Sequence, residues 1–308
     1  MKIIITDKVS PHIEKLPELK TLGEVKMYQE IISDESELLK RYQDAEIIVT
    51  NFTSLTENVI NRCKKLQYII ALSKGYNQVA VAAASARGIK VLNCPTYSSQ
   101  AVAEHALALI FALNRRLLEA YNSVMKNNWL PVEFKGNELF EKLLVTIGYG
   151  NIGQKVIRMA QGLGMRTEYA NSKTSQKDLD VLIKKADYLV LCLPLDKMTE
   201  NLIDRRRINL MKPEAYLINV ARGLIVDYDS LYAALKNKQI AGAGLDIFPH
   251  SPTSDRPTPE ITRFFKLINV VATPHIAWNT RESVVKLGEE VIANIKSCLA
   301  GKPVNVVN

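Results

Sequence analysis

Short apolar runs rich in β-branched residues alternate along the chain with longer stretches whose apolar positions have helical spacing. This alternation predicts parallel strands joined by helices. The expected strands form one series at residues 2–6, 46–50, 66–72 and 90–94, and a second at 143–148, 165–170, 188–193, 215–220, 242–247 and 270–273. Two separate series predict an α/β fold with two domains, each a doubly wound parallel sheet.

The longest helical pattern lies between the two series, at residues 98–126, and is apolar nearly all round. A helix that is hydrophobic on every side is a buried one, so we expect it between domains or at a subunit contact. A last helix is expected at about residues 280–300, because the glycine and proline that follow it form a normal helix stop.

The composition fits a chain with two hydrophobic cores. It has 308 residues, 47% of them apolar, and no apolar run approaches the roughly 18 residues of a membrane span. The first residues lack a signal-peptide layout, and the four cysteines are far apart without metal-ligand spacing. These features predict a cytoplasmic protein with reduced thiols, no metal site and no membrane association.

The formal net charge is +8, but the basic residues are scattered. The densest basic cluster, at residues 204–212, is typical of a solvated helix face. The charge therefore indicates attraction of small anionic ligands rather than binding of nucleic acid.

A glycine-rich loop follows the first expected strand of the second series and consists of Gly148, Tyr149, Gly150, Asn151, Ile152 and Gly153. It matches G-x-G-x-x-G between a strand and an amphipathic helix, the context of a dinucleotide-binding turn. Gly148 permits the tight turn, Gly150 lets the backbone approach a pyrophosphate, and Gly153 lets helix and strand pack closely. The helix N-terminus adds N–H donors and a partial positive charge. The loop therefore predicts a nucleotide site.

The end of the next expected strand indicates which nicotinamide cofactor binds. An acidic residue there would hold the ribose 2′-hydroxyl of NAD, but the strand ends at Asn171, followed by Ser172 and Lys173. Glu168 lies earlier and, by alternation, on a different face. Without a carboxylate to repel a 2′-phosphate, Ser172 and Lys173 favour NADP. In the alternative, Asn171 holds the ribose of NAD.

Motifs found in one order between residues 91 and 307 resemble those of the D-2-hydroxyacid dehydrogenase family. They are VLNCPTYSSQAVAEHALALIFALNRR, GYGNIG, ADYLVLCLPLDKMTENLI, MKPEAYLINVARGLIVDYDSLYAALKNKQIAGAGLDIF, NVVATPHIAWNT and GKPVNVV. The resemblance implies a Rossmann NAD(P)-binding domain at residues 98–277, inserted in a flavodoxin-like substrate domain at residues 1–97 and 278–308. It also implies an active site in the cleft and a homodimer packed through the nucleotide domains.

Arg222 and His275 are expected to carry the chemistry. Reduction of a 2-oxo acid needs a cation that holds the carboxylate and an acid that protonates the carbonyl oxygen as hydride arrives. Arg222 follows a strand end, and its planar guanidinium suits a carboxylate. It matches the family's substrate arginine, and His275 in TPHIAW matches the acid/base histidine. His105 also matches a family position, but AVAEHA indicates packing rather than chemistry.

Further contacts are implied by the resemblance. The loop LSKGYNQVA is similar to the family loop whose backbone amides hold the substrate carboxylate, so the expected substrate contacts are Lys74, Gly75 and Tyr76, with Tyr97 at the hinge. The expected cofactor contacts are Leu193 and Pro194 at the adenosine, and Val220, Ala221 and Asp246 at the nicotinamide. Asp246 would hydrogen-bond the carboxamide.

The family's catalytic glutamate is missing from this chain. Its position, five residues after the aspartate of LDIF and before a proline, holds Ser251. A glutamate there would raise the pKa of the histidine and orient its ring, whereas a serine hydroxyl orients without a charge. We rank three interpretations. Ser251 replaces the glutamate in a working enzyme, Asp255 or Glu260 supplies a substitute carboxylate, or catalysis has been lost.

The leading hypothesis is an NAD(P)-dependent D-2-hydroxyacid dehydrogenase that reduces a small 2-oxo acid. TPHIAW resembles the glycerate dehydrogenase and hydroxypyruvate reductase branch, which favours glyoxylate or hydroxypyruvate as substrate. A phosphoglycerate dehydrogenase-like enzyme is an alternative, and so is a catalytically impaired, nucleotide-sensing binding protein. The presence of both Arg222 and His275 favours an enzyme, because a pure binding protein does not need this pair.

Overall fold

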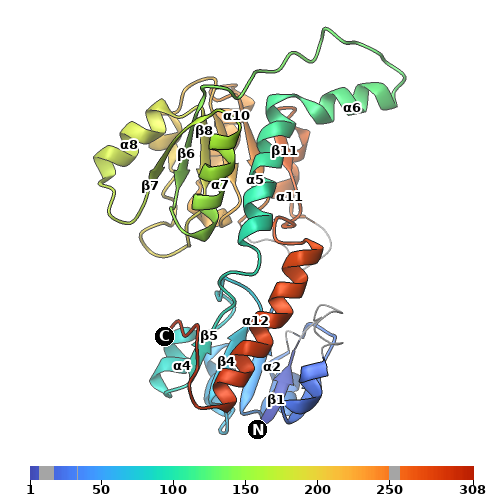
Figure 1. The fold of residues 1–308 in the computed structure, drawn as a ribbon, viewed down its shortest axis with the longest axis vertical. Coiled ribbons are helices and arrows are strands. Elements are labelled where there is room, and N and C mark those ends of the chain that lie inside the picture. The colour runs from blue at the N-terminus through green and yellow to red at the C-terminus, as the bar shows by residue number, and fades with distance from the viewer. Residues whose placement is uncertain (7–16, 33, 250–256) are drawn as a thin grey trace. The chain divides into compact units, whose positions relative to one another are not determined.

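The computed structural model describes residues 1–6, 17–32, 34–249 and 257–308, and it divides into two compact units (Figure 1). The first unit is Met1–Ser98 together with Asn279–Asn308, and the second is Ser99–Trp278. Each unit contains a parallel sheet with helices packed against it. The predicted fold class, two α/β domains with doubly wound parallel sheets, is confirmed.

The sheet of the first unit has the strand order β2-β1-β3-β4-β5, the order of flavodoxin-like folds. Its strands are β1 Lys2–Ile5, β2 Glu24–Met27, β3 Ile47–Thr50, β4 Tyr68–Ala71 and β5 Lys90–Leu92. Every pairing is parallel. The edge strand β2 was not among the expected strands. Its sequence, EVKM, has no apolar run, and none of its four residues is buried.

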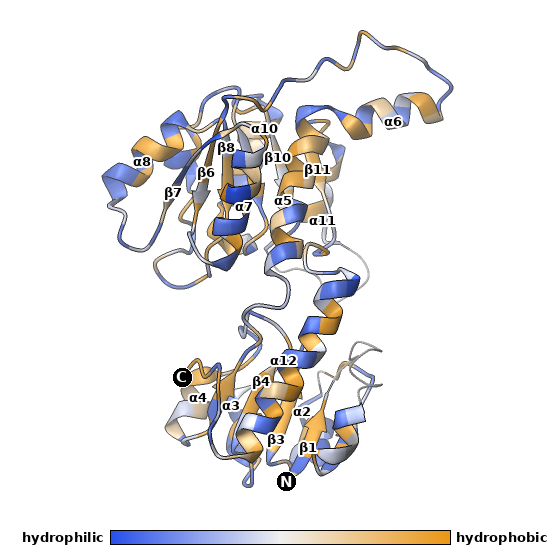
Figure 2. Ribbon diagram, viewed as in Figure 1, coloured by the Kyte–Doolittle hydropathy of each residue, from blue (hydrophilic) through white to orange (hydrophobic). Residues whose placement is uncertain are grey.

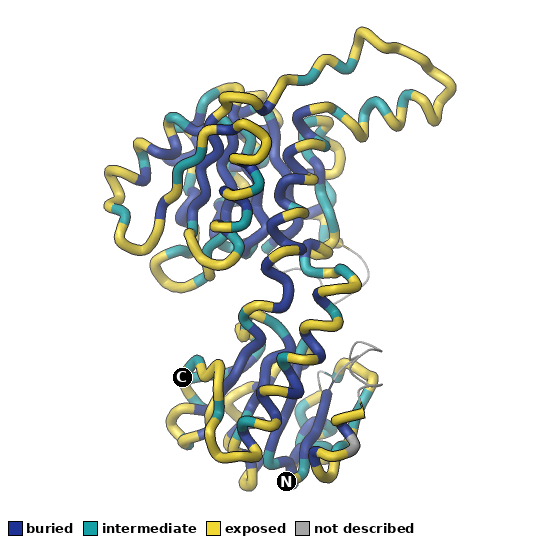
Figure 3. The backbone as a smooth tube through the Cα atoms, in the orientation of Figure 1, coloured by how far each residue is buried: buried dark blue, intermediate teal, exposed yellow. Residues whose placement is uncertain are grey.

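The helices of the first unit are α2 Glu35–Tyr42, α3 Glu57–Arg62, α4 Val81–Ala86 and α12 Arg281–Leu299, with the 3₁₀ turn η1 Pro17–Thr21. Alternate strand residues face a core shared with α2, α3 and α4, including Ile4, Ile48, Ile69 and Val91. Helix α12, although distant in sequence, packs against β4. In Figure 3 the strands of this unit are largely in the buried colour.

The second unit has the strand order β11-β10-β9-β8-β6-β7, again all parallel. Its strands are β6 Leu143–Ile147, β7 Arg166–Ala170, β8 Tyr188–Leu191, β9 Tyr216–Asn219, β10 Gly242–Leu245 and β11 Val270–Ala272. Because β7 and β8 flank β6, the chain reverses its direction of winding at this point. In open α/β sheets, ligands bind outside the carboxyl ends of the strands at such a reversal.

Helices cover both faces of this second sheet. On one face α5 Ser99–Asn114 and α7 Asn151–Gly162 pack against strand residues such as Leu144, Val190 and Ile218. On the other face, α8 Gln176–Lys185 and α10 Tyr228–Lys236 pack against Val145, Leu189 and Leu217. Shorter elements are α9 Arg205–Ile208, η2 Gly223–Ile225, α11 Pro259–Thr262 and η3 Phe264–Lys266. The period-two alternation of each strand thus fills two separate cores.

The helix expected at residues 98–126 is two helices, so that expectation of one buried helix is corrected. Helix α5 ends at Asn114, α6 spans Leu117–Met125, and Arg116 between them is left-handed with φ 49°. The Arg116 side chain donates to Glu119 and to the Glu133 carbonyl, which stabilises the break. Ten residues of α5 are buried and none of α6. Figure 2 shows that α6 nevertheless carries hydrophobic residues.

Among the residues that the structure describes, no helix is long and apolar enough to cross a membrane. The cytoplasmic location stays a prediction.

Candidate active site

The predicted residues of the second unit gather at one edge of its sheet. Because all six strands are parallel, their carboxyl ends meet at this edge. The loop after each strand carries a predicted group, namely 148–153 after β6, 171–173 after β7, 193–194 after β8, 220–222 after β9, Asp246 after β10 and His275 after β11. The tertiary structure therefore brings together residues from across 128 positions of sequence (275 − 148 + 1).

The glycine-rich loop is shaped by backbone contacts that leave no room for side chains. Gly148 has φ +103°, and a Cβ there would lie 2.5 Å from the Cys192 carbonyl oxygen. A Cβ on Gly153 would lie 2.1 Å from the Gly148 carbonyl oxygen. Gly150 differs, because a Cβ there would meet no atom within 4 Å, and as the N-cap of α7 it provides no side-chain cap. Open space beside uncapped helix N–H groups fits a pyrophosphate.

The loop after β7 presents no carboxylate at the strand end. The Asn171 side-chain oxygen accepts from the Lys173 backbone N–H at 2.9 Å, and its backbone N–H donates to the Thr174 hydroxyl at 3.0 Å. Glu168 lies within β7 and pairs with Lys185 at 2.6 Å between Oε2 and Nζ. The nearest carboxylate on this strand is thus already neutralised by a lysine of α8.

Two tyrosines stack beside the glycine-rich loop. The rings of Tyr149 and Tyr169 have centroids 3.8 Å apart and an interplanar angle of 12°. Tyr149 was predicted only as a member of the loop, and Tyr169 was not predicted at all. No sequence pattern links them, because they become neighbours only when β7 pairs with β6.

The loop after β8 places Leu193 half-buried and Pro194 exposed. The Thr199 hydroxyl donates to the Pro194 carbonyl at 2.8 Å, and the Asp196 carboxylate accepts from the Met198 and Thr199 backbone N–H groups at 2.7 and 3.0 Å. These local bonds hold the turn that follows the two predicted adenosine contacts.

A fully buried asparagine positions the arginine loop after β9. The Asn219 side-chain oxygen accepts from the Ala221 N–H, and its amide donates to the Arg222 carbonyl, both at 3.0 Å. Val220 and Ala221 are buried, and Arg222 is half-buried, with Nη1 donating to the Ala221 carbonyl at 2.7 Å. Sequence reasoning missed Asn219, which reads as an ordinary strand-end residue.

The loop after β11 holds His275 in a left-handed conformation, with φ 56°. Its backbone N–H lies 2.9 Å from the Asp246 carbonyl oxygen and 3.0 Å from the Thr273 carbonyl oxygen. Non-glycine residues adopt this conformation when the surrounding contacts over-determine it. The His275 side chain is on an exposed residue, so the imidazole remains accessible.

Asp246 supplies those contacts. One carboxylate oxygen accepts from the Thr273 hydroxyl at 2.6 Å and from the Ile276 N–H at 2.9 Å, and the other accepts from the Ala277 N–H at 3.0 Å. The residue is 1% exposed. Within the protein this carboxylate anchors the loop that carries His275. Its predicted hydrogen bond to the nicotinamide carboxamide stays a prediction.

The charges around His275 act in opposite directions. Desolvation by the surrounding protein lowers the pKa of the imidazole below its ordinary value, the Asp246 carboxylate opposes the lowering, and the Arg222 guanidinium adds to it. Since His275 is an exposed residue, the desolvation comes from protein packed around the ring rather than from complete burial. An acid with a lowered pKa donates its proton more readily but is protonated only at lower pH.

The predicted substrate contacts Lys74, Gly75, Tyr76 and Tyr97 belong to the first unit. The loop after β4 is fixed by the Ser73 hydroxyl, which donates to the Gly75 carbonyl at 2.6 Å, and by the Asn93 amide, which donates to the Lys74 carbonyl at 2.8 Å. Lys74 and Tyr76 are exposed, and Tyr97 is buried.

The position of the missing glutamate, Ser251, lies outside the described residues, as do His12, His250 and Asp255. Glu260 is described and lies in the first turn of α11. Hydrogen bonds from its own backbone N–H and from the Thr258 hydroxyl lower the pKa of its carboxyl. Glu260 therefore interacts with the start of its own helix.

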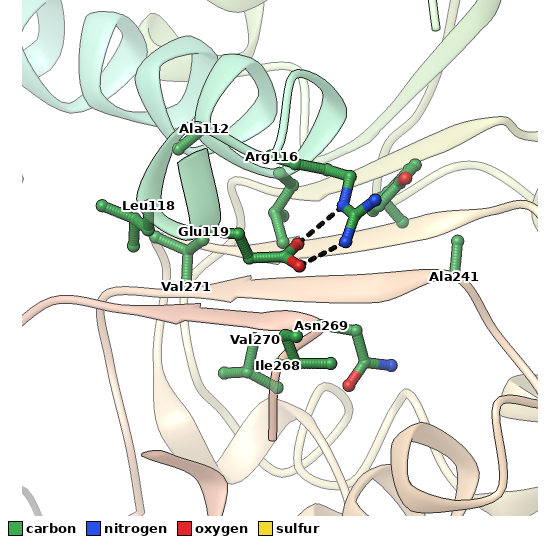
Figure 4. A pocket seen from close by; sticks show the side chains of 11 residues that line it. Ala112, Arg116, Leu118, Glu119, Ala241, Ile268, Asn269, Val270 and Val271 are labelled. Carbon is green, nitrogen blue, oxygen red and sulfur yellow. Dashed lines mark hydrogen bonds and ion pairs between the residues drawn. The ribbon is translucent and has the colours of Figure 1, made fainter. Parts of the chain in front are cut away.

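A pocket of about 200 Å³ lies at the opposite edge of the second sheet (Figure 4). It is lined by residues at the amino ends of strands, such as Tyr216 and Val270, and by the paired Arg116 and Glu119, 2.9 Å apart at Nε and Oε1. Ligands of open α/β sheets bind at the carboxyl ends, so this pocket is not the candidate active site.

Comparison with known proteins agrees with this geometry. The family model described as D-isomer specific 2-hydroxyacid dehydrogenase, NAD binding domain, matches residues 107–277. A D-3-phosphoglycerate dehydrogenase of Methanocaldococcus jannaschii is 36% identical over 321 residues, which cover 100% of this chain and 59% of that protein. A glyoxylate reductase of Thermococcus gammatolerans is 35% identical over 290 residues, which cover 88% of this chain and 85% of that protein.

A solved structure, an acyclic imino acid reductase in complex with NADPH and D-Arg, superimposes with a TM-score of 0.90 and 35% identity and covers 100% of both chains. The chain spans 59% of the length of the phosphoglycerate dehydrogenase relative. The fold and these matches together show that the chain belongs to the D-isomer-specific 2-hydroxyacid dehydrogenases, a family of NAD-dependent oxidoreductases acting on the CH–OH group of 2-hydroxy acids.

Proposed function

We propose that this chain is an NAD(P)-dependent D-2-hydroxyacid dehydrogenase that reduces a small 2-oxo acid such as glyoxylate or hydroxypyruvate. One observation carries the proposal. The glycine-rich loop, Arg222 and His275 follow β6, β9 and β11 at the same sheet edge, and the Arg222 charge acts on the His275 imidazole. A nucleotide cradle, a guanidinium and an accessible acid at one edge are the groups that this reduction requires.

Each residue has a separate task in the proposed reaction. The Arg222 guanidinium pairs with the substrate carboxylate and polarises the carbonyl that is reduced. The protonated His275 imidazole gives its proton to the carbonyl oxygen. The dinucleotide, when bound, supplies the hydride. In the first unit, the backbone N–H groups of residues 74–76 are proposed to hold the carboxylate, which makes this unit the substrate domain.

With Ser251 in place of the family glutamate, His275 has no dedicated carboxylate partner among the residues that the structure describes, and we propose that it works without one. Its lowered pKa is in keeping with this arrangement. Asp246 is the anion that acts on the ring, but its oxygens are occupied by the Thr273 hydroxyl and two backbone N–H groups. We therefore expect the reductase to be most active on the acid side of neutrality, where the imidazole is protonated.

A second candidate is reduction of a 2-imino acid. The solved structure with a TM-score of 0.90 is named as an acyclic imino acid reductase. An imino acid has the same carboxylate and accepts hydride at the same carbon, so Arg222 could bind it equally. Oxidation of a phosphoglycerate is a third candidate, supported by the 36% identical relative.

We propose NADP as the preferred cofactor, with NAD as the alternative. The absence of a strand-end carboxylate on β7 removes repulsion of a 2′-phosphate, and Lys173 is exposed beside it. The superimposed reductase is a complex with NADPH. We expect Lys173→Ala to weaken NADPH binding about fivefold, the size of an exposed ion pair, and to leave NADH binding unchanged. Lys177→Ala, an exposed lysine in the first turn of α8, is the control, measured by fluorescence titration of both nucleotides.

We also propose a homodimer that covers α6. This helix has no buried residue, and its apolar side chains include Tyr121 at 61% and Met125 at 64% exposed, followed by Trp129 at 81%. A contiguous apolar surface of this kind marks an interaction site, and a two-fold axis would let the same surface pair with itself. Light scattering of the intact protein, compared with Tyr121→Ser/Met125→Ser, tests the dimer. A monomeric wild type would contradict it.

The decisive experiment measures initial rates of NADPH and NADH oxidation with glyoxylate, hydroxypyruvate and pyruvate between pH 5.5 and 8. A second series adds ammonia or an amine to the oxo acid to detect imine reduction. We expect turnover that depends on Arg222 and falls as pH rises through a value below the ordinary 6.5 of histidine. Tight nucleotide binding without turnover of any oxo or imino acid would support the binding-protein alternative instead.

A further inference from the structure

His105 is a partly buried histidine of α5 that the proposed mechanism does not use. The sequence indicated a packing role, because it lies within a helix that is apolar on nearly every side. In the structure, however, its ring is directed at the loop that carries His275. Its Nε2 is 2.9 Å from the Thr273 hydroxyl oxygen and 3.5 Å from an Asp246 carboxylate oxygen. The His105 side chain is 19% exposed and that of Asp246 is 0% exposed.

The direction of these hydrogen bonds follows from counting protons. An ionised carboxylate can only accept, and a threonine hydroxyl has a single proton to donate. The Thr273 hydroxyl lies 2.6 Å from Asp246 and donates its proton there. The same oxygen can then only accept from His105, so Nε2 carries a proton in the neutral ring. The result is an ordered chain from His105 through Thr273 to Asp246.

This chain ends on the groups that fix the conformation of His275. Asp246 accepts from Ile276 and Ala277, and the carbonyls of Asp246 and Thr273 receive the His275 backbone N–H. All of these bonds lie within the strand ends and their own loops. His105 is the described side chain that links the network to α5, the helix that packs against β9, β10 and β11.

We propose that His105 is a positioning residue of the active site, which holds the Thr273 hydroxyl on Asp246 and thereby fixes the loop that presents His275. The part of this inference that concerns turnover rests on the proposed reductase activity. The part that concerns loop geometry does not, so the two can fail separately.

The first experiment measures the loop without any turnover. Hydrogen exchange of the amides of residues 275–277 is compared between wild type, His105→Leu and His105→Gln in the intact protein. Leucine removes the donor while filling similar space, whereas the glutamine amide restores an N–H at a similar reach. We expect exchange at 275–277 to be about tenfold faster in His105→Leu and near wild type in His105→Gln, since one well-placed hydrogen bond accounts for roughly this factor. Equal exchange in all three overturns the proposal.

The order of protons is tested by ¹⁵N spectra of histidine-labelled protein at pH 8, with the His105 signals identified by their loss in His105→Gln. We expect the neutral His105 ring to be protonated on Nε2. A ring protonated on Nδ1 overturns the proposed chain, because its Nε2 would then need a proton that Thr273 has already given to Asp246.

A third experiment separates positioning from binding. With NADPH and the best oxo acid, we expect His105→Leu to lower kcat about tenfold while the KM values stay within about twofold, and His105→Gln to recover most of kcat.

Thr273→Val breaks the same chain of hydrogen bonds, so the double variant His105→Leu/Thr273→Val should be no slower than Thr273→Val alone. Glu104→Gln, an exposed neighbour on α5, is the matched control. The proposal is overturned if the effects of His105→Leu and Thr273→Val on kcat are fully additive in the double variant, or if His105→Leu changes only KM. A wild type without turnover contradicts the proposed function, while the exchange experiment still decides the role of His105.

Discussion

Two loops at the same edge of the second sheet are held in shape by opposite means. The loop after β6 depends on the absence of side chains, because a Cβ on Gly148 or Gly153 would collide with backbone 2.5 or 2.1 Å away. The loop after β11 contains no glycine and depends on a buried carboxylate, which receives the Thr273 hydroxyl and two backbone N–H groups. The first leaves space for a ligand, and the second presents a side chain to one.

The difference shows how backbone recognition and side-chain chemistry place different demands on a loop. A loop whose N–H groups bind a phosphate must let the ligand approach the main chain, so it needs glycine. A loop that presents an acid must hold one residue in a fixed direction, here at φ 56°, so it needs polar partners. Four substitutions separate these two mechanisms.

The largest effect is expected for Asp246→Asn. The amide places a donor where the carboxylate accepted, and at least one N–H of Ile276 or Ala277 loses its partner in a buried site. We expect unfolding to become easier by about 3 kcal/mol and turnover to fall about 100-fold, because the His275 loop is displaced. Denaturant unfolding and initial rates measure the two quantities. The exposed Asp229→Asn is the control, and equal behaviour of both variants would contradict the anchoring role.

Gly153→Ala should be the next in size. Alanine normally stabilises a helix, but here its methyl would meet the Gly148 carbonyl oxygen at 2.1 Å, and we expect a loss of about 2 kcal/mol in unfolding free energy. Gly162→Ala in the same helix meets nothing within 4 Å and should gain up to about 1 kcal/mol. Thermal unfolding of both variants is sufficient, and a stabilised Gly153→Ala would refute the close approach of helix and strand.

Gly150→Ala is expected to change binding and not folding. Its backbone, at φ −86°, accepts alanine, and no atom lies within 4 Å of the added methyl. Unfolding should therefore stay within about 0.5 kcal/mol of wild type. We expect nucleotide affinity to fall about tenfold or more, because the methyl occupies space proposed for the pyrophosphate. Unchanged affinity in a calorimetric titration would place the phosphates elsewhere.

The smallest effect is the contribution of His275 to the pH dependence of stability. Its folded pKa lies below the ordinary 6.5, so between these two values the unfolded chain binds more protons than the folded one. Stability therefore rises with pH through this window and is lost as pH falls below about 6.5. Between pH 7 and pH 5, the free energy of unfolding of the wild type should therefore fall more than that of His275→Gln. An opposite slope would mean that the Asp246 charge outweighs desolvation.

The fold was predictable because its signals are local. All ten expected strands overlap strands of the structure, because short apolar runs between helical patterns mark them along the chain. The strand that was missed, β2, lies at an edge and has alternating charged positions without an apolar run. The boundary between α5 and α6 was missed for a different reason. Both helices are apolar, and the break depends on Arg116 reaching Glu133, which is distant in sequence.

The candidate site divides in the same way. The glycine-rich loop was predicted from motif spacing, and Arg222 and His275 from the family resemblance together with the chemistry of strand ends. The structure places all three after strands at one sheet edge. Asn219 and the Tyr149–Tyr169 stack could not be found by this means. Their partners are set by how strands and loops lie against one another, and no short pattern records that.

The sequence by itself determined that this chain forms two parallel α/β sheets, and it predicted which groups would bind a nucleotide and a 2-oxo acid, because strand periodicity and loop chemistry are properties of adjacent residues. Only the tertiary structure decided what holds those groups in place. Asp246 anchors the His275 loop, and His105 on α5 contacts that anchor from 141 positions away (246 − 105). Such contacts form only when the sheet order brings α5 and the ends of β10 and β11 together. The buried carboxylate after β10 is stable there because the loop after β11 supplies a hydroxyl and two N–H donors to it.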